Sequence, residues 1–157
     1  MRKRIIKQDP AGASPPAERW LDLEHLAQVE LTSENPSYPI EAALSPGAAS
    51  EWRADRPGEQ TIRLLFDRPQ QIRRVYLVFQ ENEQERTHEF VLRWSSDGGH
   101  SFREIVRQQY NFNPSDTTQE VEDLTLELHG VTTIELTIIP DISGRDVRAS
   151  VAQLLLA

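Results

Sequence analysis

The stretch Glu89–Val106, EFVLRWSSDGGHSFREIV, decides the fold of this chain. Before its centre, Phe90, Leu92 and Trp94 share one face and Glu89 and Arg93 the other, which is the two-residue period of a β-strand. Asp97-Gly98 then indicates a hairpin, because the turn needs a positive φ that Gly tolerates and that Asp supports by local hydrogen bonding. The run after the turn is strand-like again. We therefore predict two antiparallel strands joined by a tight connection.

The same stretch contains Ser95, Asp97 and His100, the residue types of a nucleophilic triad. A triad needs its three side chains to converge, with the base hydrogen-bonded to the nucleophile. On a hairpin, neighbouring side chains point to opposite faces or into solvent. The nucleophile elbow, the phosphate-binding loop and the HExxH motif are also absent from the sequence. The sequence therefore predicts that these residues form the turn between two strands, and it predicts no enzyme activity.

Apolar residues alternate with polar ones at 27–31, 62–66, 124–128 and 134–138, and further strand-like runs lie at 72–79 and 151–157. The run 72–79 is apolar on both faces, which favours a central place in a sheet. Proline and glycine clusters separate these runs, and only 40–44 suits a short helix. About eight strands at this spacing predict an all-β protein, an antiparallel two-sheet β-sandwich or jelly roll.

The chain has 157 residues, enough for one domain. We expect a flexible N-terminal arm over residues 1–17, rich in proline and charge, and a folded domain over 18–157. The absence of cysteine excludes disulfides, thiolate zinc sites and cysteine nucleophiles. The net charge of −8 weighs against nucleic acid and anionic membranes as partners.

The N-terminal stretch MRKRIIKQDPAGASPP has a basic head, but only Ile5 and Ile6 follow as apolar residues. A secretory signal would need an apolar stretch of roughly 7–15 residues there. No apolar run approaches the ~20 residues of a membrane-spanning helix. We therefore expect a cytoplasmic protein without a membrane partner.

Residues 91–105, VLRWSSDGGHSFREI, resemble the hairpin of discoidin-type domains, also called coagulation-factor type C domains or galactose-binding-like jelly rolls. Three other segments resemble this family in the same order: 37–54, with Trp52 at the matching position, 58–79 and 133–157. The resemblance covers roughly Trp20 to Ala157. It implies a discoidin-like jelly roll and a non-catalytic recognition module, since most members bind sugars, phospholipid heads or protein partners.

Many sugar-binding members of this family hold a structural calcium ion with a carboxylate from the last strand. The comparable residue here is Gln153, which is neutral, whereas calcium needs several oxygen ligands including carboxylates. The segment Asp141–Asp146, DISGRD, lacks a later bidentate glutamate at calcium-loop spacing and is better explained as a polar turn. The four histidines have no metal-binding spacing. The sequence predicts neither a metal nor another cofactor.

Sugar recognition needs an aromatic plate for the apolar ring face and polar groups for the hydroxyls. Residues of these kinds fall in the predicted loops, and the candidates for ligand binding are Tyr38, Arg53, Arg86, His88, Tyr110, Asn111, Phe112 and Arg145. Tyr110 and Phe112 could instead close the end of the core, and Arg86 and His88 could decorate a solvated strand start. Trp52 is expected in the core rather than at a ligand.

Two functions remain open at this stage. The first is binding of carbohydrate, or of a similar polyhydroxylated ligand, through loops at one end of the sandwich. The second is an intracellular adaptor domain that binds another protein, indicated by the missing signal sequence, the doubtful calcium site and the acidic balance. The acidic pair Glu120 and Glu122 is expected to be solvated rather than catalytic.

Overall fold

The computed structural model describes residues 2–4 and 20–157. It confirms the predicted hairpin: β4 (Arg86–Ser95) and β5 (Arg103–Phe112) are antiparallel neighbours. The loop between them is held by Asp97, whose carboxylate accepts hydrogen bonds from the Ser95 hydroxyl at 2.6 Å and from the Ser101 amide at 2.9 Å. The Ser101 hydroxyl also donates to this carboxylate, and its bond is the largest cause of the lowered pKa of Asp97, followed by the bond from Ser95. The serines and the aspartate thus shape a turn.

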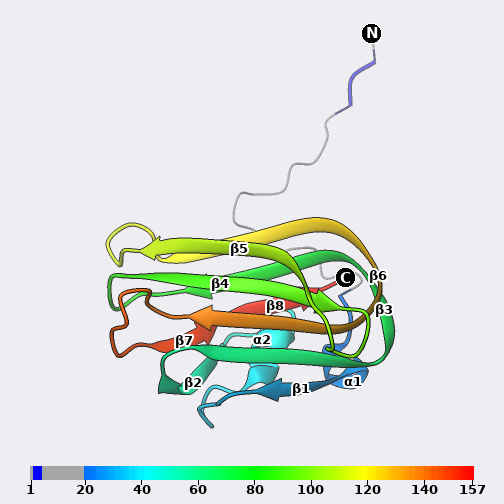
Figure 1. Ribbon diagram of the computed structural model, residues 1–157. Helices are drawn as coiled ribbons and strands as arrows, with labels where there is room; N and C mark the ends of the chain where they lie inside the picture. Colours follow the sequence, from blue (N-terminus) through cyan, green and yellow to red (C-terminus); the bar gives the residue numbers. More distant parts are fainter. Residues whose placement is uncertain (1, 5–19) are drawn as a thin grey trace.

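Two long strands, β3 (Gln60–Gln80) and β6 (Gln119–Ile139), form the frame of the domain. They pair antiparallel along their length, with register shifts between Leu65 and Arg74. Figure 1 shows both strands curving over at one side of the molecule, so that each contributes to both layers of the sandwich.

One layer of the sandwich is made by β5, β4, the second half of β6, the first half of β3 and β1 (Ala27–Leu31). The other is made by the first half of β6, the second half of β3 and β8 (Gln153–Leu156). A separate antiparallel pair joins β2 (Trp52–Pro57) to β7 (Arg148–Val151). Two short helices, α1 (Leu23–Leu26) and α2 (Ile40–Leu44), complete the architecture.

The core is filled by the inward-facing residues of this alternating pattern. In the first half of β3, Ile62, Leu64 and Phe66 are buried, while Arg63 is exposed. Helix α2 adds Ala43 and Leu44 to the same cluster. Trp52 is fully buried, and its indole Nε1 donates to the Ser33 carbonyl at 3.2 Å. The predicted sandwich, the short helix at 40–44 and the core position of Trp52 are confirmed.

The strand prediction from the sequence split each of two continuous strands into two. It predicted separate strands at 62–66 and 72–79, but both lie in β3, and 124–128 and 134–138 both lie in β6. The prolines and glycines between them, such as Pro69 and Gly130, were expected to end the strands. They lie where the strands bend from one layer to the other. Gly130, with φ of 67°, takes a conformation that suits glycine.

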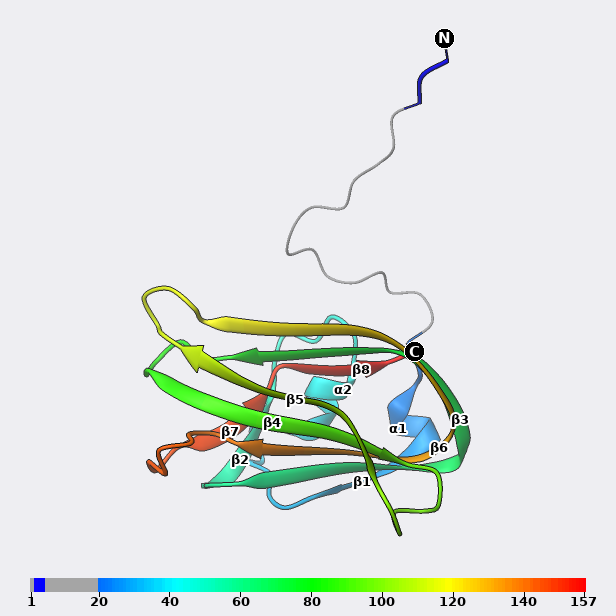
Figure 2. The ribbon, with the colours of Figure 1, turned by 45° about the horizontal axis from the view of Figure 1, so that its top comes forward.

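The sandwich has two unlike ends (Figure 2). One end holds the strand bends, the loop between β4 and β5, and the C-terminus. The other, here called the loop end, collects the connections 32–39, 81–85, 113–118 and 140–147. The expected flexible arm over residues 1–17 lies, apart from residues 2–4, outside the described part of the chain. Within the described part, no helix is long and apolar enough to cross a membrane.

Candidate ligand-binding site

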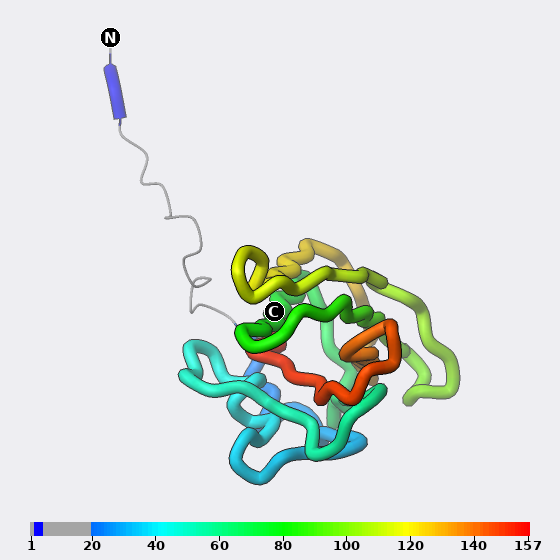
Figure 3. Tube along the Cα trace, turned by 90° about the vertical axis from the view of Figure 1, so that its left-hand side faces the viewer, coloured from blue at the N-terminus to red at the C-terminus, as the bar shows by residue number. Residues whose placement is uncertain are grey.

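Figure 3 looks onto the loop end of the sandwich. Three of its connections and the first residues of β2 and β7 line a hollow. This hollow, called the end groove here, has a volume of about 360 Å³. Its walls come from the turn 81–84, from the start of β7 and from the region around Arg53. The lining is mostly polar and includes Asn35, Glu51, Gln80, Asn82, Asp146 and Arg148. Such a surface offers both donors and acceptors to a ligand.

Arg53 lines this groove, and Tyr38 lies beside the groove in contact with Arg53. The Arg53 guanidinium carbon lies 4.0 Å from the centre of the Tyr38 ring, a cation–π contact. Two backbone hydrogen bonds fix this geometry, from the Arg53 amide to the Tyr38 carbonyl and from the Asn35 amide to the Arg53 carbonyl. Arg53 is paired with Glu51 at 3.0 Å, yet 44% of its side chain is exposed. Its remaining N–H groups are therefore accessible to a ligand.

Arg86 lies below the groove and serves as a tie between loops. It is buried, its Nε donates to Glu81 Oε1 at 2.6 Å, and its Nη1 donates to the Pro140 carbonyl at 2.7 Å. Its guanidinium carbon also lies 5.2 Å from the centre of the Phe112 ring. Because these contacts join the turn after β3 to the loop after β6, Arg86 holds the groove floor in shape.

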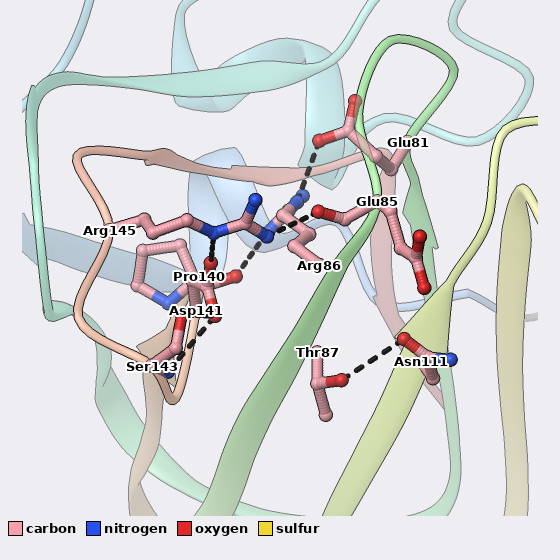
Figure 4. Close-up of polar contacts among 9 residues, drawn as sticks. All are labelled: Glu81, Glu85, Arg86, Thr87, Asn111, Pro140, Asp141, Ser143 and Arg145. Carbon is pink, nitrogen blue, oxygen red and sulfur yellow. Dashed lines mark hydrogen bonds and ion pairs between the residues drawn. The ribbon is translucent and has the colours of Figure 1, made fainter.

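Arg145 approaches Arg86 from the loop after β6, as Figure 4 shows. It donates to the Glu85 carbonyl, and its Nε donates to Asp141 Oδ2 at 2.5 Å. Asp141 also accepts from the Ser143 amide and hydroxyl. Burial acts to raise the pKa of Asp141, but the bonds from Ser143 and Arg145 outweigh it and lower the pKa. The predicted polar turn at 141–146 is confirmed.

His88 and Phe112, two of the predicted ligand residues, are interior. Phe112 is fully buried, and its ring centre lies 4.8 Å from that of His88. His88 Nε2 lies 2.6 Å from Glu120 Oε1, and both side chains are buried. The alternative in which Arg86 and His88 are exposed to solvent at the start of a strand is therefore wrong. The solvent-exposed position expected for Glu120 is wrong as well. The structure gives His88 and Phe112 a packing role instead of a surface for a ligand.

Burial shifts the ionisation of this interior cluster. Burial, followed by the charge of Arg86, lowers the pKa of His88 to about 3, so its imidazole is neutral at pH 7. Burial raises the pKa of Glu120. Burial and then the neighbouring Glu120 raise the pKa of Glu122 to about 7. A charge on Glu122 is thus disfavoured in the folded protein.

Replacing Glu122 with glutamine should change how stability depends on pH. The folded-state pKa of Glu122 lies above its unfolded value, so the native protein binds more protons between pH 4.5 and 7 and loses stability as pH rises through that window. As the pH is raised from 4.5 to 8, we expect the unfolding free energy of Glu122→Gln to increase by about 1 kcal/mol relative to that of the wild type. This value allows for solvent screening. Urea unfolding at both pH values measures this gain. Glu127→Gln, an exposed site on the same strand, is the control, and equal profiles for both variants would contradict the assignment.

Tyr110 and Asn111 lie at the end of β5, beside the interior cluster and outside the lining of the end groove. The Tyr110 hydroxyl donates to the Gln119 carbonyl at 2.9 Å, and its ring contacts Phe112 at 5.0 Å between centres. Asn111 Oδ1 accepts from the Thr87 hydroxyl at 3.0 Å (Figure 4). The structure therefore favours the alternative in which Tyr110 and Phe112 close the end of the core.

The groove also contains residues that sequence reasoning missed. Glu51, Gln80 and Asp146 line it, although none was among the predicted site residues. Each stands next to a buried neighbour, Trp52, Phe79 and Val147 respectively. A polar residue beside a buried one at the end of a strand is the signal that could have indicated them.

The resemblance to discoidin-type domains implies a calcium site beside the last strand, and the donor set here does not fit one. At the comparable position, the Gln153 side-chain Nε2 donates to the Ser45 carbonyl at 3.0 Å. An amide N–H therefore takes the loop oxygen that a cation would need. Within residues 2–4 and 20–157, no group of three or more histidine or acidic side chains could hold a metal ion.

No protein-family model matches the chain, and no curated protein sequence matches it. Solved structures do match. A pectin-binding carbohydrate-binding module is 16% identical, with a TM-score of 0.61 over 83% of this chain and 89% of that one. The family 32 carbohydrate-binding module of NanJ from Clostridium perfringens, in complex with galactose, is 12% identical, with a TM-score of 0.64 over 87% and 96%. The family 32 module of AlyQ, in complex with 4,5-unsaturated mannuronic acid, is 17% identical, with a TM-score of 0.62 over 88% and 98%.

At these identities the likeness concerns the fold. The chain has the same jelly-roll fold as these carbohydrate-binding modules. The fold that the hairpin at 91–105 predicted is thereby confirmed.

Proposed function

We propose that this domain is a non-catalytic carbohydrate-binding module that holds its ligand in the end groove. The observation that carries the proposal is the Tyr38–Arg53 pair, in which a partly exposed guanidinium that lines the end groove lies over an aromatic ring beside that groove. The solved domains of this fold support it, since one binds pectin and two others hold a galactose or a uronic acid.

The groups around the end groove match what a polyhydroxylated ligand needs. Arg53 and Arg148 donate hydrogen bonds, Glu51 and Asp146 accept them, and the amides of residues such as Asn82 do both. A planar guanidinium can donate two N–H groups to neighbouring hydroxyls, and a tyrosine ring can pack against the apolar C–H face of a sugar. Because Arg86 and Arg145 tie the surrounding loops together, the groove is formed before the ligand arrives.

The positions of the residues that could act as general acids or bases support a non-catalytic role. Asp97 is occupied by hydrogen bonds that shape its turn, and His100 is exposed beside it. The His88–Glu120 pair is enclosed by the aromatic core and cannot reach a substrate. A general base must come within hydrogen-bonding distance of the proton it removes.

Replacing Arg53 with alanine tests the proposed site. We expect a loss of carbohydrate affinity of about tenfold or more, because hydrogen bonds from a charged donor contribute about 1.5–3 kcal/mol. A glycan array would first identify the best sugar, and titration calorimetry would then compare the variant with wild type. The thermal midpoint should fall modestly, since the Arg53 side chain is 44% exposed but its partner Glu51 is only 19% exposed.

The matched control is Arg107→Ala. Arg107 is similarly exposed, with 53% of its side chain accessible, and likewise pairs with a carboxylate, Glu104, but it lies on β5 away from the groove. Equal effects of the two substitutions on affinity would exclude Arg53 as a ligand contact. An array without any hit would reject carbohydrate binding itself and favour the protein-adaptor alternative, which a pull-down from host lysate would then examine.

A further inference from the structure

A second hollow, called the side groove here, adjoins the end groove. Its volume is about 770 Å³, and Glu51, Arg53 and Gln80 line both hollows. The two are therefore halves of one trough that meet at Arg53. The floor of the side groove is the outer face of β3 and β6, including Val78 and Val121, and its wall is the loop 47–51.

The lining of the side groove differs from that of the end groove. It carries an apolar strip of Tyr76, Val78, Val121 and small alanines, flanked by the amides of Gln80 and Gln119. Val121 is 46% exposed, which is unusual here: within the described residues, Ile142 is the one other large apolar side chain so exposed. An apolar strip edged by amides suits a sugar ring, since the C–H face packs on the strip while hydroxyls bond to the amides.

The trough is long compared with a single sugar ring. Tyr76 and Gln80 both line the side groove and are four residues apart on β3, which places them about 13 Å apart along the strand. The end groove extends the path beyond Gln80. Tyr38 stands beside the junction and Tyr76 near the far end, so aromatic rings are available at two separate points.

The charges along the trough disfavour a strongly acidic ligand. The carboxylates of Glu51, Glu81, Glu83, Asp123 and Asp146 line the two hollows, against the guanidinium groups of Arg53, Arg86 and Arg148. Glu51 and Glu81 are paired with Arg53 and Arg86, and Asp123 is paired with Arg74 from outside the lining. A chain of uronic acids would bring further negative charge to a surface with more carboxylates than guanidinium groups, which is unfavourable.

We propose that the side groove is a second carbohydrate subsite, and that the domain binds a neutral oligosaccharide along the whole trough rather than a single sugar. This inference rests on the proposed carbohydrate binding. Arg53 lies at the junction of the two subsites, the end groove holds one ring by hydrogen bonds, and the strip around Val121 holds later rings by apolar contact.

The test compares ligands by length and by charge. An array of neutral and uronic-acid oligosaccharides of one to six units would be followed by calorimetry of the neutral series that binds best. We expect affinity to rise at least tenfold from one unit to three or four, and acidic oligomers of equal length to bind more weakly. Affinity that is independent of length, or a preference for the acidic series, would overturn the inference while leaving carbohydrate binding intact. No binding to any glycan would reject both proposals.

Two substitutions test whether the side groove is the source of the higher affinity for longer oligosaccharides. Val121→Glu places a charge on the apolar strip at an exposed position, so folding should be preserved. We expect it to remove the gain with length, about tenfold, and to leave binding of the single sugar unchanged. Thr125→Glu is the control, because Thr125 is also exposed on β6 and lies outside the trough. An unchanged length dependence in Val121→Glu, or the same loss in both variants, would contradict a subsite at this place.

Discussion

Replacing Arg86 with alanine should cost about 3–5 kcal/mol of unfolding free energy, because it breaks a buried ion pair and leaves one partner behind. Arg86 is 4% exposed, and its removal leaves the carboxylate of Glu81 and the carbonyl of Pro140 without their donor. Urea unfolding monitored by tryptophan fluorescence measures the change. For a domain of ordinary stability this is a large share of the total.

A double substitution separates the unpaired charge from the lost packing. Arg86→Met combined with Glu81→Leu removes both charges and keeps apolar volume, so it should recover most of the loss caused by Arg86→Ala. Arg53→Ala, which breaks a pair whose arginine is 44% exposed, should cost less than Arg86→Ala. A loss below 1 kcal/mol in Arg86→Ala would show that Arg86 does not tie the loops in the way described.

Replacing Trp52 with alanine should destabilise the domain by a similar amount, about 3–5 kcal/mol. Its side chain is fully buried in the main core cluster and is also bonded to the Ser33 carbonyl. The substitution leaves a cavity and an unpaired carbonyl. Thermal and urea unfolding both measure the effect.

The control variants are Trp52→Phe and Trp94→Ala. Phenylalanine retains most of the apolar contact but loses the hydrogen bond, so its cost should be about 1–2 kcal/mol. Trp94 is only partly buried, with Arg103 over its ring, and should cost less than Trp52. If Trp94→Ala proved as destabilising as Trp52→Ala, the difference in burial between the two tryptophans would not account for the cost of Trp52→Ala.

The eight predicted site residues show how far local reasoning reaches. All of them lie at the loop end, because each stands in or beside a connection between predicted strands. The structure then separates them: Tyr38 and Arg53 line the trough, Arg86 and Arg145 tie its loops together, and His88 and Phe112 are interior. Tyr110 and Asn111 lie at the end of β5, beside that interior cluster. The ligand-binding role of the eight residues stays a prediction.

The corrections concern polar residues whose partners are far away in the sequence. Arg86, His88 and Glu120 are of residue types usually found in contact with water. Arg86 is buried because the Pro140 carbonyl, 54 residues later, accepts its hydrogen bond, and His88 because Glu120 lies beside it, 32 residues later. The two-residue period indicates which face a side chain occupies, but not which strand will cover that face.

The sequence by itself determined the class of fold, the hairpin at 91–105, the short helix and the place of Trp52, since each depends on neighbouring residues through side-chain alternation, turn conformation and apolar burial. Only the tertiary structure decided that β3 and β6 run through both layers, which polar residues are buried, and that two hollows meet at Arg53. Those features depend on contacts between segments remote in the chain, and their free energy appears only when both segments are in place.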